Sequence, residues 1–136
     1  MGYVKALEEA GAIVHDFKNF GSWQGDWWAK VTYGNMEGFV HGAFGSCTVC
    51  DAFQAEFHSV MHTHPDGTMV FGGYDVDEVF LDDCEECANT QKRLREFGLR
   101  YLDNSFFTKE EALEKAKKDM SWDVEADEMV KWIEER

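Results

Sequence analysis

Several sequence features are scarce in this chain of 136 residues, and each absence argues against a class of protein. Proline occurs once, at Pro65, and no low-complexity tract interrupts the chain. No apolar run approaches the ~18 residues of a membrane-spanning helix, so we expect no membrane partner. The opening MGYVKALEEAGAIV lacks the basic and then apolar segments of a secretory signal peptide, which predicts a cytoplasmic protein.

Basic residues are missing from the middle of the chain. No Lys or Arg occurs from Val31 to Gln91, and this segment carries eleven acidic residues, so it holds −11 of the formal net charge of −14. A surface of this kind repels a phosphate backbone, and we therefore expect no direct nucleic-acid binding. It attracts a basic protein instead. The alternative is that the acidity serves solubility alone.

The composition predicts one folded domain, because 44% of the residues are apolar and 15% are aromatic. Strand-like patterns dominate residues 1–81 and helical patterns dominate residues 82–136, an order that predicts an α+β fold. A short helix over 3–10 and a strand over 12–17 open the chain. The segments 52–62 (AFQAEFHSVMH) and 68–80 (TMVFGGYDVDEVF) are predicted to be further strands.

The clearest local pattern is a β-hairpin over about 27–42. Two strand-like runs flank Gly34-Asn35, a pair that tolerates the positive φ angles of a two-residue turn. Trp27 and Trp28 then point to opposite faces of the sheet. An outward Trp28 would anchor a protein partner, or else a helix from the segment that contains Trp132 covers it.

Three helices are predicted in the second half, over about 84–102, 109–120 and 122–135. Asp82 with Glu85, and Thr108 with Glu111, have the spacing of a capping box at a helix start. The apolar spacing changes phase near residue 120, with Ser121 as a candidate cap. This change predicts either two helices or one kinked helix over 109–135.

The four cysteines form two C-x2-C pairs, Cys47/Cys50 and Cys84/Cys87, with 33 residues between them. In a reducing cytoplasm such pairs favour metal or redox chemistry over disulfides. A pair on a turn followed by a pair in the first turn of a helix resembles the treble-clef zinc fingers, over about residues 45–100. That resemblance implies a structural Zn2+ held by all four cysteines. Metal-free thiols, a redox dithiol and a disulfide between the pairs are the alternatives.

A second group of candidate ligands is rich in histidine. His62 and His64 alternate along a predicted strand and therefore share a face. Together with Asp75 they resemble the zinc motif of the JAMM metallo-isopeptidases, although Gly72 replaces that family's serine. The resemblance implies a metal-dependent hydrolase whose catalytic zinc is held by His62, His64 and Asp75. Two further alternatives are that either histidine replaces a cysteine in a structural site, or that the histidines are surface residues.

The runs GSWQGDWW (21–28) and GSCTVCDAF (45–53) resemble segments of small, uncharacterised proteins of tailed bacteriophages. Those proteins share a G-S-aromatic-Q-G-x-W opening, a G-S-C-x-x-C-D motif and an acidic helical tail. The resemblance implies a phage product in the cytoplasm of a bacterial host. It also implies an inhibitor of host nucleases or defence systems, as anti-CRISPR proteins are.

We therefore expect a non-enzymatic interaction protein with a structural zinc site. It would act as a nucleic-acid mimic on a basic host protein, such as a nuclease or a nucleoprotein complex. The main alternative is the JAMM-like hydrolase, and a structural or accessory zinc module of a phage is a third. The expected contact residues are Trp28 and the acidic residues Asp75, Asp77, Glu78, Asp82, Asp83, Glu85 and Glu86.

Overall fold

The computed structural model describes residues 2–46, 51–58, 61–71, 80–81, 83–118 and 125–136. It has an α+β fold in which an antiparallel sheet is followed by C-terminal helices, as predicted. The sheet has the order β1-β2-β3-β6 and comprises β1 (Ile13–Gly21), β2 (Gly25–Tyr33), β3 (Met36–Phe44) and β6 (Phe106–Phe107). A separate two-stranded hairpin contains β4 (Met61–Thr63) and β5 (Met69–Phe71). The helices are α1 (Tyr3–Glu9), α2 (Ala52–Phe57), α3 (Glu85–Asn104), α4 (Lys109–Lys118) and α5 (Ala126–Glu134).

The predicted β-hairpin is confirmed as β2 and β3. Tyr33 pairs with Met36 across the turn, and Gly34 has a φ of 63°, which a two-residue hairpin turn requires. Both strands extend beyond the predicted bounds, because their ladder continues to Gly25 and Phe44. The hairpin forms the centre of the sheet.

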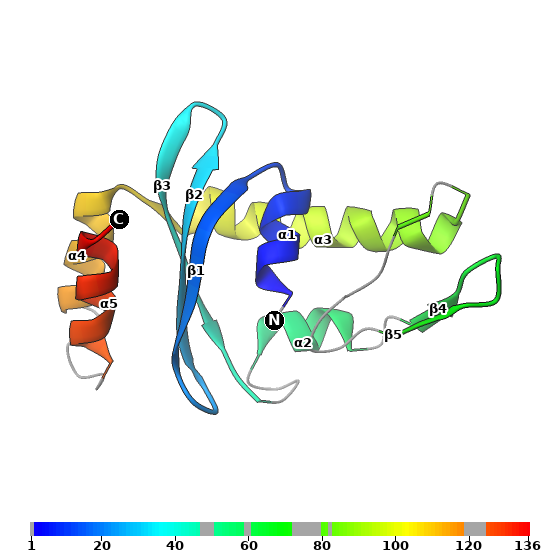
Figure 1. The fold of residues 1–136 in the computed structure, drawn as a ribbon, viewed down its shortest axis with the longest axis horizontal. Helices are drawn as coiled ribbons and strands as arrows, with labels where there is room; N and C mark the ends of the chain where they lie inside the picture. Colours follow the sequence, from blue (N-terminus) through cyan, green and yellow to red (C-terminus); the bar gives the residue numbers. More distant parts are fainter. Residues whose placement is uncertain (1, 47–50, 59–60, 72–79, 82, 119–124) are drawn as a thin grey trace.

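Helices cover both faces of the sheet, and Figure 1 shows α1 and α3 on one side and α4 and α5 on the other. Trp27 belongs to the core beneath α1 and α3, whereas Trp28 belongs to the core beneath α4 and α5 and shares it with Trp132. Trp28 is 0% exposed, so its predicted role as an exposed partner anchor is wrong. The alternative, cover by the helix that carries Trp132, is confirmed.

Residues 52–57 form helix α2, so the strand predicted over 52–62 is wrong for this part. Asp51 is the N-cap, and its carboxylate accepts a hydrogen bond from the Gln54 N–H at 3.1 Å. Phe53 and Phe57, four residues apart, are buried and contact Phe97 of α3. In a segment of six residues, apolar side chains four apart fit both a helix and an alternating strand. The N-cap at Asp51 favours the helix. The strand predicted over 68–80 is described only to Phe71, as β5.

The predicted capping box at Thr108 and Glu111 is confirmed. The Thr108 N–H donates to Glu111 Oε1 at 2.9 Å, and the Glu111 N–H donates to Thr108 Oγ1 at 3.2 Å. Helices α4 and α5 pack against each other, so the segment 109–135 contains two helices and not one kinked helix. The predicted cap Ser121 lies outside the described residues. The N-cap of α3 is Cys84, so the capping box predicted for Asp82 and Glu85 is wrong.

A buried carboxylate ties three elements together near the N-terminus. Asp51 accepts hydrogen bonds from the Tyr3 hydroxyl at 2.8 Å and from the Gly45 N–H at 2.9 Å, besides its helix cap. Burial, together with the bond to Asp51, raises the pKa of Tyr3 well above its usual range. Burial also raises the pKa of Tyr101 to about 12. The folded state therefore favours the neutral form of both phenols.

We expect Tyr3→Phe to lower the free energy of unfolding by ~1–3 kcal/mol, because the buried Asp51 carboxylate loses a donor. Tyr33→Phe, at the edge of the β2–β3 turn, is the matched control and should have a small effect. Urea unfolding followed by tryptophan fluorescence measures both. Equal stability of Tyr3→Phe and the control would show that the Tyr3–Asp51 bond contributes nothing net.

The raised phenol pKa values also predict an alkaline loss of stability. The unfolded chain releases its phenolic protons near pH 10, whereas the folded chain holds that of Tyr101 to about pH 12. The unfolded state then binds fewer protons, so the stability contribution is complete below pH 10 and falls as the pH rises through 12. Urea unfolding at pH 9, 10 and 11 should show this decline, and Tyr101→Phe should reduce its slope. An unchanged slope in this variant would contradict the assignment.

Candidate metal centre

Four side chains from two distant segments meet at one end of the molecule. Their ligand atoms all lie within 4.8 Å of one another, and we refer to His62, His64, Cys84 and Cys87 as the His2Cys2 cluster. Cys87 Sγ lies 3.2 Å from His64 Nε2 and 3.5 Å from His62 Nε2. Both cysteines and His64 are buried, and the side chain of His62 is 4% exposed. The cluster is compatible with a structural metal ion.

The turn that follows β4 places His64 beside His62. The Gly67 N–H donates to the His64 carbonyl at 2.9 Å, and the His64 N–H donates to the Thr68 carbonyl at 2.8 Å. This arrangement is a turn with Pro65 at its second position and Gly67, φ 90°, in the left-handed region. Its residues H-P-D-G-T therefore close the β4–β5 hairpin and hold His64 just beyond the end of the strand.

The start of α3 supplies the two sulfurs. Cys84 is the N-cap, and its Sγ accepts a hydrogen bond from the Cys87 N–H at 3.3 Å. Residues three apart in the first turn of a helix lie on one face, so both sulfurs point toward the hairpin. The partial positive charge of a helix N-terminus favours the thiolate form that metal ions require.

The distances in the cluster fit a small tetrahedral ion. Bonds of ~2.3 Å to sulfur and ~2.0 Å to nitrogen separate the ligand atoms of such an ion by about 3.3–3.8 Å. The two contacts of Cys87 Sγ, 3.2 and 3.5 Å, are close to this range, and the largest separation exceeds it by about 1 Å. Small movements of the side chains would therefore close the tetrahedron.

The carboxylate of Glu86 lies near the His62 ring, on the Nδ1 side. Glu86 Oε2 is 3.8 Å from Nδ1 of His62, on the side of the ring away from the sulfurs. In metal sites, a carboxylate that accepts a hydrogen bond from the second ring nitrogen of a histidine ligand orients the ring; at 3.8 Å, Glu86 is within ion-pair distance of His62 but beyond hydrogen-bond distance. Glu86 is therefore the candidate positioning residue for His62.

The structure brings together residues of the two predicted ligand sets, for which a mixed site with one histidine in place of a cysteine was a predicted alternative; here both histidines take part. Cys84 and Cys87 came from the four-cysteine set, and His62 and His64 from the His–Asp set. The other members of those sets, Cys47, Cys50 and Asp75, lie outside the described residues. A sequence signal for the combined set did exist, since H-x-H and C-x2-C each place two ligands on one face of an element.

The predicted partner-binding acids are only partly described. Asp83, Glu85 and Glu86 are exposed at the start of α3, next to the cluster. Asp75, Asp77, Glu78 and Asp82 lie outside the described residues. The described acids therefore place negative charge at the end of the molecule that carries the His2Cys2 cluster.

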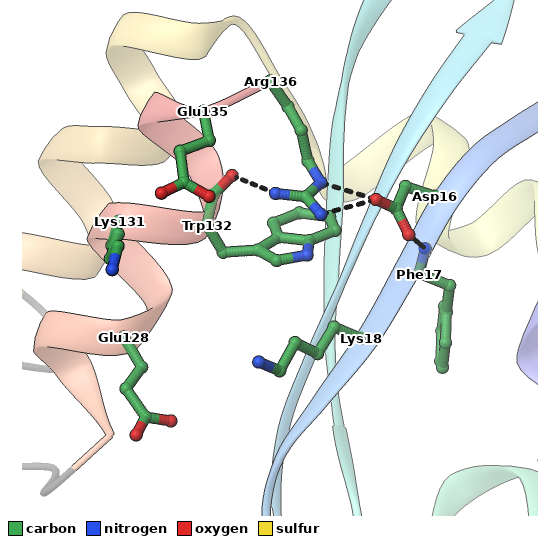
Figure 2. Close-up of a pocket in the computed structure, with 8 residues that line it drawn as sticks. All are labelled: Asp16, Phe17, Lys18, Glu128, Lys131, Trp132, Glu135 and Arg136. Carbon is green, nitrogen blue, oxygen red and sulfur yellow. Dashed lines mark hydrogen bonds and ion pairs between the residues drawn. The ribbon is translucent and has the colours of Figure 1, made fainter.

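A pocket lined by described residues lies between β1 and α5, at the end of the molecule opposite the cluster. This cavity has a volume of about 500 Å3. Arg136 pairs there with Asp16 at 2.6 Å and lies over the ring of Trp132 (Figure 2). Smaller cavities of about 270 and 220 Å3 also border α4 or its first residue, Lys109. Because these cavities surround α4 and α5, they do not hold a substrate over the His2Cys2 cluster.

Comparisons with protein-family models, with curated proteins and with solved structures found no match. Among the described residues, no helix is both long enough and apolar enough to cross a membrane. The site is therefore interpreted from its own geometry and chemistry.

We expect Glu86→Gln to weaken metal binding toward the lower end of the ~10–100-fold range seen for residues behind a ligand, because Glu86 is largely exposed. Glu85→Gln removes the same charge one residue earlier and is the matched control. Competition with a chromophoric chelator measures the affinity of both variants. Equal losses in the two would indicate a general charge effect and contradict the positioning role.

Proposed function

We propose that this chain is a non-catalytic interaction protein with a structural Zn2+ site. The zinc is held by Nε2 of His62 and His64 and by the thiolates of Cys84 and Cys87. The supporting observation is the convergence of these four ligand atoms within 4.8 Å in a mostly buried position. Buried imidazole and thiolate pairs in a tetrahedron are the preferred environment of structural zinc.

The charge of the site supports this ligand set over four cysteines. Zn2+ with two thiolates and two neutral imidazoles has no net charge, whereas four thiolates leave a charge of −2. The segment from Val31 to Gln91 contains no Lys or Arg to neutralise such a charge, and Glu85 and Glu86 directly follow Cys84. A neutral site is therefore electrostatically compatible with its acidic surroundings.

The same ligand set argues against a hydrolase. A catalytic zinc keeps one position open for water, whereas two histidines and two cysteines fill all four. Without a metal, the contacts of Cys87 with the two histidines would be thiol–imidazole hydrogen bonds. Metal content separates that alternative from zinc.

The proposed partner is a basic, nucleic-acid-handling protein of a bacterial host. Support comes from the acidic residues at the metal end, Asp83, Glu85 and Glu86, and from the absence of basic residues over 31–91. Such a surface attracts proteins that bind phosphate backbones, and it can compete with nucleic acid for them. The resemblance to tailed-phage proteins supplies the host context, with inhibition as the proposed outcome.

Native mass spectrometry of the purified chain should show one zinc ion per molecule. We expect His64→Ala and Cys87→Ser to lose the ion, because each removes a ligand from a closed tetrahedron. Cys47→Ser and Asp75→Ala are controls that should retain it. Circular dichroism of each variant reports whether the fold persists.

Three outcomes would contradict the proposed zinc site or its ligand set. Loss of zinc in Cys47→Ser with retention in His64→Ala would identify a four-cysteine site. Loss in Asp75→Ala with retention in Cys87→Ser would identify the His–Asp site of a hydrolase. Metal-free wild-type protein would leave the cluster as a hydrogen-bonded group.

A further inference from the structure

The two cysteines of the His2Cys2 cluster are also placed to react with each other. Cys84 is the N-cap of α3, and Cys87 lies three residues later in the first turn of the helix. In a regular helical turn, Cα atoms three residues apart are ~5 Å from each other, within the ~4.4–6.8 Å that a disulfide spans. Their sulfur atoms already lie within 4.8 Å of each other. A disulfide between Cys84 and Cys87 therefore requires rotation of their side chains and no approach of distant segments.

The two sulfurs differ in how far a small molecule can reach them. Cys84 is 5% exposed, whereas Cys87 is 0% exposed and its Sγ contacts both His62 and His64. The Cys87 N–H donates to Cys84 Sγ at 3.3 Å at the positive end of the helix, which favours the reactive thiolate form of Cys84. A thiolate that small oxidants can reach, beside a second cysteine that resolves the product, is the usual arrangement of a redox-sensitive pair.

Charge and access together select the oxidant. Asp83, Glu85 and Glu86 are exposed and flank Cys84 in the chain. Their negative charge opposes the approach of anionic oxidants such as glutathione disulfide, and the small exposed area of Cys84 hinders large ones. Hydrogen peroxide is neutral and close to water in size, so neither barrier applies to it. The oxidant that fits the site is therefore a small, neutral peroxide.

We propose that Cys84 and Cys87 form a peroxide-sensitive switch that releases the zinc and frees the β4–β5 hairpin from α3. This inference rests on the proposed zinc site and adds its regulation. The Cys84 thiolate attacks one peroxide oxygen, the O–O bond breaks, and the other oxygen takes up a proton and leaves as water. The Cys87 thiolate then attacks the sulfenic sulfur of Cys84, and the S–O bond breaks as the S–S bond forms. With a second proton, that oxygen also leaves as water, so two electrons pass from the thiolates to the peroxide.

Oxidation removes the attachment of the hairpin. A disulfide no longer supplies thiolate ligands, so His62 and His64 alone remain to bind the ion, and two ligands do not make a closed tetrahedral site. Each strand of the hairpin has three residues, and an isolated two-stranded hairpin is at best marginally stable in water. The hairpin should therefore lose its fixed position against the first turn of α3. A thiol reductant reverses the change, because it restores both cysteines.

The chemical test uses the full zinc-loaded chain and its Cys47→Ser/Cys50→Ser variant, in which Cys84 and Cys87 are the remaining cysteines. A chromophoric chelator records zinc release, and peptide mass spectrometry identifies the sulfur products. We expect hydrogen peroxide to release one zinc ion for each Cys84–Cys87 disulfide formed, in both proteins. Dithiothreitol followed by zinc should restore the starting state. Glutathione disulfide at the same concentration should release zinc at least about tenfold more slowly.

Hydrogen–deuterium exchange of the same samples tests the release of the hairpin. Oxidation should speed exchange in peptides that cover 61–71, which contain β4 and β5. Peptides that cover 25–44 are the internal control, because β2 and β3 form the centre of the sheet and should exchange at an unchanged rate.

Four results would overturn the switch. The first is zinc and both thiols that stay intact in peroxide, under conditions in which the urea-unfolded chain is oxidised. The second is zinc release with sulfinic acid on Cys84 or Cys87 and no disulfide between them. Unchanged exchange over 61–71 after the disulfide forms would show that the hairpin stays in place, and equally fast reaction with glutathione disulfide would contradict the selection of peroxide.

Zinc content measured before oxidation separates the two proposals. A chain that holds no zinc contradicts the proposed function, and with it the switch that depends on that site. A zinc-loaded chain that forms no Cys84–Cys87 disulfide contradicts the switch alone.

Discussion

The contact between the β4–β5 hairpin and the first turn of α3 is the constraint on which the candidate metal centre depends. Cys87 Sγ meets Nε2 of both His62 and His64 there, and these atoms come from segments more than twenty residues apart in the chain. The hairpin is too short to be stable alone, and its other face is exposed. Its position therefore follows from how the two histidines and two cysteines bind one another, or one ion.

The larger part of the fold provides a rigid base for that contact. The central sheet buries Trp27 beneath α1 and α3 and Trp28 beneath α4 and α5, so both faces are covered. Asp51 joins α1, α2 and the end of β3 through hydrogen bonds. Helix α3 connects this base to the cluster. Its buried residues Leu94 and Phe97 pack in the core beneath α1 and α3, whereas Cys87 lies in the first turn of the helix.

Charge neutrality links the site to the function proposed for it. A metal centre of two thiolates and two imidazoles adds no charge to a region that contains no basic residue, and it leaves the surrounding acids available to a partner. The proposed zinc would hold the β4–β5 hairpin against the first turn of α3.

Short-range signals in the sequence determined much of the fold. Gly34-Asn35 set the central hairpin and Thr108 with Glu111 set the start of α4, because a turn and a capping box depend only on neighbouring residues. The H-x-H and C-x2-C patterns likewise identified all four members of the His2Cys2 cluster. The tertiary structure decided which of these ligands meet, since that depends on how the hairpin packs against α3. It also decided that Trp28 is buried, because an alternating strand pattern places a side chain on a face but does not say what covers that face.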